Sequence, residues 1–205
     1  MGIEKKFRGH YKKIITLCGF LLLTFSAGAE TIYELDFSTA SGNVQNWFEK
    51  IKWEFREDVT YMNLRFEDGK LVIEPTEDEL GVLIREFEKK DYLHGVSKIR
   101  IEWGVDQYPL GADWSGPKDK IRNTREAISF MVFFGDTKLD SGFALAPDLP
   151  YFISFFLAKN ESPDQIYYGN YWQEGGRYLC IPCDGSKGKT FVTEIDLSAK
   201  FLELF

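Results

Sequence analysis

The chain has 205 residues, enough for one domain with a substantial core, and 44% of them are hydrophobic while 16% are aromatic. Its 32 acidic residues outnumber its 25 basic ones and give a net charge of −7. Such an acidic surface repels nucleic acid phosphates and anionic lipid head groups, so we expect neither as a partner.

The first 29 residues are typical of a cleaved secretory signal peptide. A basic segment (residues 5–13) precedes an apolar run (14–25), and the small residues Ala27 and Ala29 follow it. The run is shorter than the ~20 residues of a membrane-spanning helix. We therefore expect a periplasmic or secreted mature chain that starts near Glu30, has no membrane span, and carries a net charge of −11.

Period-two alternation of apolar and polar residues then predicts half-buried strands. Residues 50–55 place Ile51, Trp53 and Phe55 on one face. Residues 61–74 read as a hairpin with its turn at Asp68-Gly69, and residues 98–103 repeat the alternation.

Two further runs, residues 127–135 and 151–159, are apolar at nearly every position, which is typical of strands that are covered on both faces. A helix is predicted in residues 196–205, with Asp196 or Ser198 as the N-cap and one apolar side. That side consists of Phe201, Leu202 and Phe205.

Short strands separated by Gly, Asp and Pro turns predict an all-β fold. We expect an antiparallel β-sandwich of jelly-roll (concanavalin/galactose-binding-like) type with a short C-terminal helix. No internal repeat or linker divides the mature chain, so residues 30–205 are expected to form a single β-sandwich domain.

Four segments in this order, "IRIEWGVDQYPLGADW", "REAISFMVFFG", "PDLPYFISFFLA" and "GRYLCIPC", carry a resemblance to a known family. From about Phe37 onward the chain resembles the bacterial family catalogued as domain of unknown function 3047, a group of uncharacterised secreted or periplasmic proteins. Its members usually show Trp-x-Trp where this chain has Ile101-Glu102-Trp103, and they continue past the terminal helix into an acidic strand. The resemblance implies that the domain lacks a closing strand and keeps an unpaired edge, and it implies no activity.

Several common chemistries lack the residues that they need. His94 is the only histidine of the mature chain, and no Gly-x-Ser-x-Gly elbow accompanies it, so we interpret it as a solvent-facing turn residue. No phosphate-binding Gly-rich loop precedes a helix. We expect no cofactor, and a zinc site would need further ligands. Carboxylates of the loop at residues 106–126 could hold a structural Ca²⁺, although they show no regular ligand spacing.

Cys180 and Cys183 form a Cys-x-x-Cys pair in a segment that reads as strand, turn, strand. Redox activity needs the first thiolate at a helix N-terminus, which this segment does not offer. A local disulfide or two free strand thiols are the favoured alternatives.

The stretch "YYGNYW" is the strongest candidate for ligand binding. Flat rings on a loop can stack against sugars, with Asn170, Gln173 and Glu174 near enough in the chain to supply polar groups. The other interpretation is that these rings belong to the core or its rim. Alternation along the segment places Tyr168 and Trp172 on one face and Tyr167 and Tyr171 on the other. The candidate ligand-binding residues are Tyr167, Tyr168, Tyr171, Trp172 and Arg177, with Asp113 and Trp114 from an earlier loop.

A polar cluster occupies the long connection from residue 106 to residue 126, and long loops in compact domains often carry function. Glu102 and Asp106 could form a glycosidase-like acid pair. Tyr108 with Arg122 or Arg125 could abstract a proton and neutralise a uronate in a lyase. The alternative is ion pairing among solvated loop charges.

These observations favour an extracytoplasmic, non-catalytic module that binds carbohydrate or envelope polymer. A glycan-cleaving enzyme, either a glycoside hydrolase or a polysaccharide lyase, is the first alternative. A structural envelope protein is the second. The sequence leaves the oligomeric state open.

Overall fold

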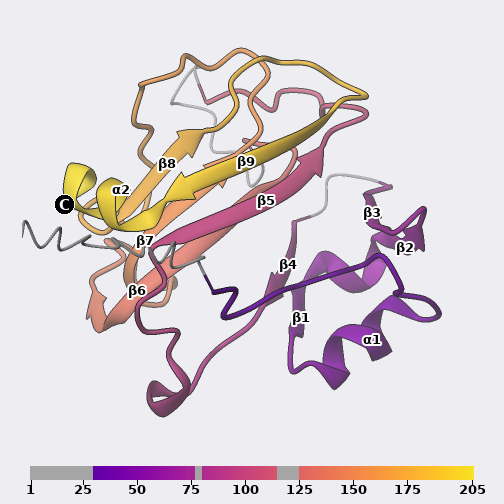
Figure 1. Cartoon of the computed structure of the whole chain (residues 1–205). Coiled ribbons are helices and arrows are strands. Elements are labelled where there is room, and N and C mark those ends of the chain that lie inside the picture. The colour runs from indigo at the N-terminus through magenta and orange to yellow at the C-terminus, as the bar shows by residue number, and fades with distance from the viewer. Residues whose placement is uncertain (1–29, 77–79, 115–124) are drawn as a thin grey trace, which may run out of the picture. The chain divides into compact units, whose positions relative to one another are not determined.

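A computed structural model describes residues 30–76, 80–114 and 125–205 (Figure 1). The chain divides into two compact units, Met1–Thr31 and Ile32–Phe205, and every element below belongs to the second. The predicted signal peptide, residues 1–29, lies outside the described residues.

The second unit is rich in strands and holds few helices. Its elements in chain order are α1 (Val44–Lys50), β1 (Glu54–Glu57), η1 (Asp58–Tyr61), β2 (Asn63–Glu67), β3 (Lys70–Glu74), β4 (Gly81–Ile84), η2 (Lys89–Asp91), β5 (Lys98–Gly104), β6 (Ser129–Leu139), β7 (Leu149–Phe156), β8 (Gly176–Cys180), β9 (Thr190–Asp196) and α2 (Leu197–Leu204).

The strands form mostly antiparallel sheets, as the sequence predicts. The two-stranded sheets β1–β4, β2–β3 and β5–β9 are antiparallel throughout. In the three-stranded sheet, β7 lies between β6 and β8 and runs antiparallel to β6 but parallel to β8. The expectation of antiparallel pairing is therefore wrong for β7 and β8, which need a long connection in place of a tight turn.

The predicted hairpin is confirmed as β2–β3, with Phe66 opposite Leu71. Its turn places Asp68 at φ 50° and Gly69 at φ 72°. Two consecutive positive φ values are typical of the turn that matches the twist of a two-residue hairpin, and Asp-Gly is a preferred sequence for it. Local chemistry is thus sufficient to define this element.

Helix α1 is absent from the sequence-based expectation, and the strand expected at residues 50–55 begins only at Glu54. The side chain of Asn43 caps the helix by accepting the N–H of Asn46 at 2.9 Å. Val44 and Phe48, four residues apart, are its buried side chains. The ring of Phe48 lies 5.9 Å from that of Trp53, so the alternating residues after the helix still pack inward.

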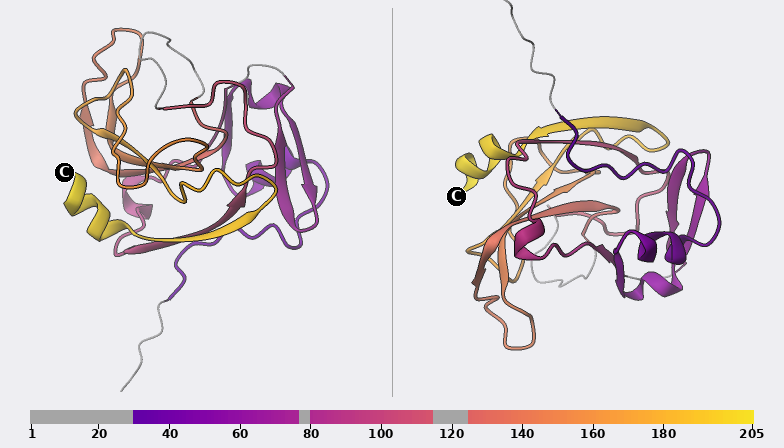
Figure 2. Two further views of the ribbon diagram at one scale, coloured as in Figure 1. Left: turned by 90° about the horizontal axis from the view of Figure 1, so that it is seen from above. Right: turned by 60° about the horizontal axis from the view of Figure 1, so that its bottom comes forward.

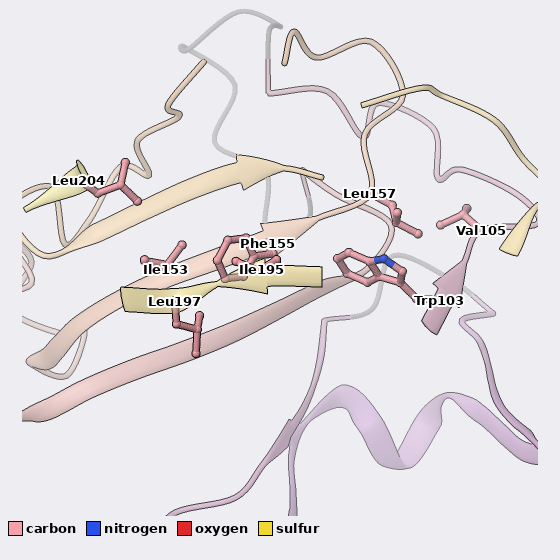
Figure 3. Close-up of a cluster of buried hydrophobic side chains, with 8 residues drawn as sticks. All are labelled: Trp103, Val105, Ile153, Phe155, Leu157, Ile195, Leu197 and Leu204. Carbon is pink, nitrogen blue, oxygen red and sulfur yellow. The ribbon is translucent and has the colours of Figure 1, made fainter. Parts of the chain in front are cut away.

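Strand β7 carries the core of the larger sheets. Its side chains Ile153 and Phe155 are fully buried and share a cluster with Trp103 of β5 and Ile195 of β9 (Figure 3). Figure 2 shows the β5–β9 ribbon along one side of the β6–β7–β8 sheet. Inside this cluster, Trp103 Nε1 donates to Thr193 Oγ1 at 2.9 Å, so the indole is buried with its polar atom paired.

The two long apolar runs differ in burial. Strand β7 is covered on both faces, because residues 152–158 are all buried. Strand β6 is an edge strand, and Met131 and Phe133 on one face of it remain 37% and 40% exposed. The expectation that both strands are covered on both faces is therefore wrong for β6.

Helix α2 occupies the predicted position, and Asp196 caps it by accepting the N–H of Ala199 at 2.9 Å. Its apolar side differs from the prediction, since Leu202 is 82% exposed while Leu197 and Leu204 are buried. Phe201 packs on Phe134 of β6 with ring centroids 4.8 Å apart.

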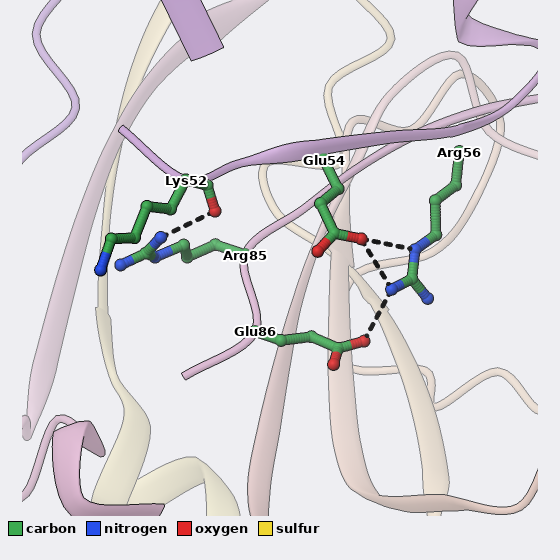
Figure 4. A network of polar contacts seen from close by, with 5 residues as sticks. All are labelled: Lys52, Glu54, Arg56, Arg85 and Glu86. Atoms are coloured by element: carbon green, nitrogen blue, oxygen red, sulfur yellow. Dashed lines mark hydrogen bonds and ion pairs between the residues drawn. The ribbon is translucent and has the colours of Figure 1, made fainter. Parts of the chain in front are cut away.

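The β1–β4 pair carries an exposed polar network (Figure 4). Arg56 bridges Glu54 at 2.9 Å and Glu86 at 3.0 Å, and Arg85 donates to the carbonyl of Lys52 at 2.7 Å. Solvated ion pairs of this kind contribute little to stability. Because its acids are already paired, the network offers no free carboxylate for chemistry.

Candidate functional site

The connection between β7 and β8 carries the predicted aromatic segment. Tyr167 is only 4% exposed, pairs with Tyr178 in an isolated β-bridge, and accepts the N–H of Ser162 at its hydroxyl, 3.0 Å away. The next residue, Tyr168, is 52% exposed. Alternation thus separates these two rings as expected, and it places Tyr167 in the core and not in a binding surface.

The alternation does not continue to Tyr171 and Trp172, because this part of the connection is a turn. Tyr171 stacks on Phe143 with ring centroids 4.9 Å apart and an interplanar angle of 20°. Trp172 adopts a positive φ of 55°, and its Nε1 donates to the carbonyl of Pro147 at 2.8 Å. Both rings are half-buried, so Trp172 anchors the turn while Tyr171 forms a ring pair beside it.

Arg177, near the start of β8, contacts two exposed rings. Its guanidinium carbon lies 4.9 Å from the ring centroid of Tyr168 and 4.8 Å from that of Phe205. Its Nη1 donates to the carbonyls of Gln173 and Gly176, both at 2.9 Å. These hydrogen bonds tie the guanidinium to the turn and so restrict its position relative to the two rings.

Phe205 is 40% exposed and packs against one ring of α2 and one of β7. Its ring lies 5.1 Å from that of Phe201 and 4.9 Å from that of Tyr151. Because neighbouring rings restrict its motion, the exposed part of Phe205 is a preformed contact area. We define the aromatic surface as Phe143, Tyr168, Tyr171, Arg177 and Phe205.

A shallow, open hollow of about 560 Å³ adjoins Phe143. Seven residues of one loop line it, namely Asp140, Ser141, Gly142, Phe143, Ala144, Ala146 and Asp148. The loop is held by Ser141, whose backbone carbonyl accepts the N–H of Trp172 at 2.9 Å. The hollow and the turn that carries Tyr171 are therefore parts of one packed arrangement.

Trp114 lies in a second, more buried cluster. It is 8% exposed, and its ring lies 4.5 Å from that of Tyr178. Arg125 places its guanidinium carbon 5.1 Å from the centroid of the indole, and Glu126 accepts the indole N–H at 2.8 Å. The structure thus brings Trp114 and Arg125 together, although the sequence assigned them to different roles.

The Trp114 cluster perturbs its ionisable groups. Burial raises the pKa of Glu126 to about 6, despite the hydrogen bond that Trp114 donates to it. Burial also raises the pKa of the Tyr178 hydroxyl, and the charge of Glu126 adds to that effect. The carboxyl groups that act as general acids in enzymes often have a raised pKa, as this half-buried one does.

Glu161 fixes the loop that holds Trp114. It is 5% exposed, and it accepts the backbone N–H of Trp114 at 2.6 Å and those of Lys159 and Asn160 at 3.1 and 2.9 Å. Three backbone donors satisfy a buried carboxylate. Glu161 therefore joins two loops. Asp113, which precedes Trp114 in the chain, is half-buried and has a partner of its own.

The structure places the predicted catalytic residues in different settings. Glu102 is exposed on β5, and its Oε2 lies 3.8 Å from Nη2 of Arg100. Asp106 is exposed in the following loop. Tyr108 donates its hydroxyl to the carbonyl of Ala158 at 3.0 Å, which is a structural contact. Arg122 lies outside the described residues.

Cys180 and Cys183 are joined in a disulfide. Cys180 is 7% exposed and belongs to the cluster of Trp114 and Tyr167. The bond follows β8 directly, and no helix begins at the first cysteine. The pair therefore closes the end of the strand.

Sequence reasoning missed four residues that matter here: Phe143, Phe205, Glu126 and Glu161. The first two join Tyr171 and Arg177 only through tertiary packing. A signal existed for Glu126, which adjoins an apolar strand and was counted among loop charges. Glu161 precedes Ser162-Pro163 and gave no sequence signal of burial.

Comparisons with protein-family models, with curated proteins and with solved structures found no match. No helix in the described ranges is long and apolar enough to cross a membrane. Over the same residues, no group of His, Cys, Asp and Glu side chains is placed to hold a metal ion. With no match to a known protein, the aromatic surface and the Trp114 cluster are the features that bear on function.

Proposed function

We propose that the protein is an extracytoplasmic, non-catalytic module of jelly-roll type that binds a carbohydrate or envelope polymer on the aromatic surface. The observation that carries the proposal is the contact of Arg177 with the exposed rings of Tyr168 and Phe205. Exposed rings that are held in place bind flat ligands without a large loss of side-chain entropy.

The shape of the surface favours an extended ligand over an enclosed small molecule. Phe143, which stacks on Tyr171, lines a hollow that is shallow and open. Sites for small molecules usually bury most of the ligand in a closed cleft. Exposed rings at two places, Phe143 with Tyr171 and Tyr168 with Phe205, suit a polymer that contacts more than one point of the molecule.

The proposed compartment is supported by one feature of the structure. The disulfide between Cys180 and Cys183 fits an oxidising environment, where such bonds persist. Mass spectrometry of protein from the native host should find an N-terminus near Glu30. An intact Met1 start in the cytosolic fraction would contradict the proposed export.

The binding proposal is tested by replacing single rings. Tyr168→Ala and Tyr171→Ala should each weaken binding to a responsive polysaccharide by ~1 to 3 kcal/mol, the scale of stacking on an aromatic side chain. The control is Tyr61→Ala, because Tyr61 is 73% exposed and lies outside the aromatic surface. Affinity electrophoresis over a polysaccharide panel measures the change. Equal affinities for all three variants and the parent would remove the aromatic surface from the proposal.

A catalytic function is the second candidate, and Glu126 is the observation that favours it. Its carboxyl, with a pKa of about 6 in an aromatic setting, has the protonation behaviour of a glycosidase general acid. Glu126→Gln should then abolish release of reducing ends from a polysaccharide panel while the fold stays intact. Because we propose a non-catalytic module, we expect the parent protein to release no reducing ends. Clear release by the parent would favour the enzyme.

A further inference from the structure

Arg177 has a free set of hydrogen-bond donors that the contacts of the aromatic surface do not use. A guanidinium has five N–H donors, all in its plane. Nη1 donates to the carbonyls of Gln173 and Gly176. Nowhere in the described chain do Nε and Nη2 have an acceptor, and no carboxylate there forms an ion pair with Arg177.

The ring contacts of Arg177 leave its hydrogen-bond donors unused. Its guanidinium carbon lies over the rings of Tyr168 and Phe205, 4.9 and 4.8 Å from their centroids, and a ring face offers the N–H groups no oxygen acceptor. The backbone carbonyls occupy the Nη1 part of the guanidinium edge. The remaining edge presents Nε–H and Nη2–H as two parallel donors, the fork that pairs with carboxylate and phosphate groups.

We propose that Arg177 is an acid-recognising subsite, and that the polymer bound by the aromatic surface carries carboxylate or phosphate groups. This inference rests on the proposed function and adds the ligand class to it. Neutral hydroxyls can accept single hydrogen bonds from the fork, but only an oxyanion accepts both donors and neutralises the charge. The subsite therefore selects an acidic polymer over a neutral one of the same shape.

The acidic net charge of the chain does not oppose this selection at close range. At physiological ionic strength, charges further away than about 8 Å are largely screened. The groups in direct contact with the guanidinium of Arg177 in the described residues are two carbonyls and two rings, and no carboxylate there pairs with it. The net charge slows association of an acidic ligand, while the fork stabilises the complex once it has formed.

The test compares two ligands that differ only in charge. Isothermal titration calorimetry is run with a polyuronate oligomer and with its methyl ester, in about 0.15 M salt near pH 7. We expect the acid to bind at least about tenfold more tightly than the ester, the scale of one hydrogen bond between charged groups. Poly(glycerol phosphate), tested in parallel, decides whether the natural group is a carboxylate or a phosphate.

Variants assign the preference to Arg177. Arg177→Gln should bring acid and ester to equal affinity, and Arg177→Lys should lose most of the preference because an ammonium keeps the charge but not the planar fork. The control is Arg100→Gln, since Arg100 is exposed on β5 and lies outside the aromatic surface. That variant should keep the full difference between the two ligands.

The outcomes separate this inference from the function on which it rests. Equal binding of acid and ester by the parent protein overturns the acid-recognising subsite and leaves polymer binding intact. Binding of neither ligand nor of any polysaccharide in the panel overturns both. If the Arg177 variants fail to fold, the ligand pair with the parent protein still decides.

Discussion

Tyr167 and Tyr168 are adjacent in the chain and have opposite environments, with exposed fractions of 4% and 52%. Tyr167→Ala should lower the free energy of unfolding by ~3 to 5 kcal/mol, because it leaves a cavity beside Trp114. Tyr168→Ala should lower it by about 1 kcal/mol or less, the value of an exposed cation–π contact with Arg177. Urea denaturation of both variants measures the difference, and similar losses would show that the two rings share one environment.

Glu126 should make stability depend on pH in a defined window. Burial raises the pKa of its carboxyl from the ordinary 4.5 to about 6, so between these values the native state holds a proton that the unfolded chain has released. The free energy of unfolding therefore falls as pH rises through this window. At about 1.4 kcal/mol for each pKa unit, the loss reaches about 2 kcal/mol at most.

Urea denaturation between about pH 4 and pH 7 tests this expectation, because Glu126→Gln has no charge to lose. The stability of the parent relative to that variant should fall as pH rises through the pKa of Glu126, near 6. The matched control is Glu174→Gln, at an exposed residue of the turn before β8. Parallel curves for parent and Glu126→Gln would mean that the carboxyl titrates as it does in water.

At the scale of elements, helix α2 is capped by Asp196, one of the two N-caps that the sequence allows. Asp196→Ala should lower the free energy of unfolding by about 1 kcal/mol, because the N–H of Ala199 loses its acceptor. Ser198→Ala should change it by less than about 0.5 kcal/mol, since Ser198 is exposed inside the helix. Thermal unfolding followed by circular dichroism compares the two, and a larger loss for Ser198→Ala would move the cap.

Elements defined by neighbouring residues could be predicted from the sequence. The hairpin at Asp68-Gly69 and strand β5 follow from turn chemistry and alternation. Helix α1 was missed because the alternating residues Ile51 and Trp53 follow it at once, although Asn43 and the spacing of Val44 and Phe48 indicated a capped helix. The parallel pairing of β7 with β8 has no local signal, because register between distant strands depends on packing.

In the candidate site, too, contacts between residues close in the chain could be predicted and contacts between distant residues could not. Alternation correctly separated Tyr167 from Tyr168, since both are close to the bridge with β8. The contact of Arg177 with Phe205 joins residues far apart in the chain, and it forms only after α2 packs on β7. The sequence suggests a loop residue at Trp114, whereas the structure buries it. Glu161 accepts its backbone N–H and Glu126 accepts its indole N–H.

At the scale of the whole molecule, the larger unit has separate sets of buried rings. The first surrounds Phe48, which lies 5.9 Å from Phe37, Trp53 and Phe55 alike. The second contains Phe155, in the cluster shared by the β5–β9 and β6–β7–β8 sheets. Strand pairing stays within each set, because β1 to β4 pair only with one another and β5 to β9 do the same in the described residues.

Native-state hydrogen exchange should therefore show two units of local opening. Phe48→Ala should increase exchange in α1 and β1 to β3 while protection in β6 to β8 stays near that of the parent protein. Phe155→Ala should have the reverse effect, since both rings are buried and each loss costs ~3 to 5 kcal/mol. Loss of protection throughout the chain for either variant would show one cooperative unit.

The parallel pairing of β7 with β8 also bears on how this protein could be engineered. The chain must cross from the end of one strand to the start of the other, and residues 157–175 make that crossing. Loop closure costs little more when a loop grows, so the crossing tolerates replacement better than a tight hairpin does. Libraries that vary residues 168–171 and keep the buried Tyr167 and the anchoring Trp172 can therefore diversify the aromatic surface on an unchanged sheet.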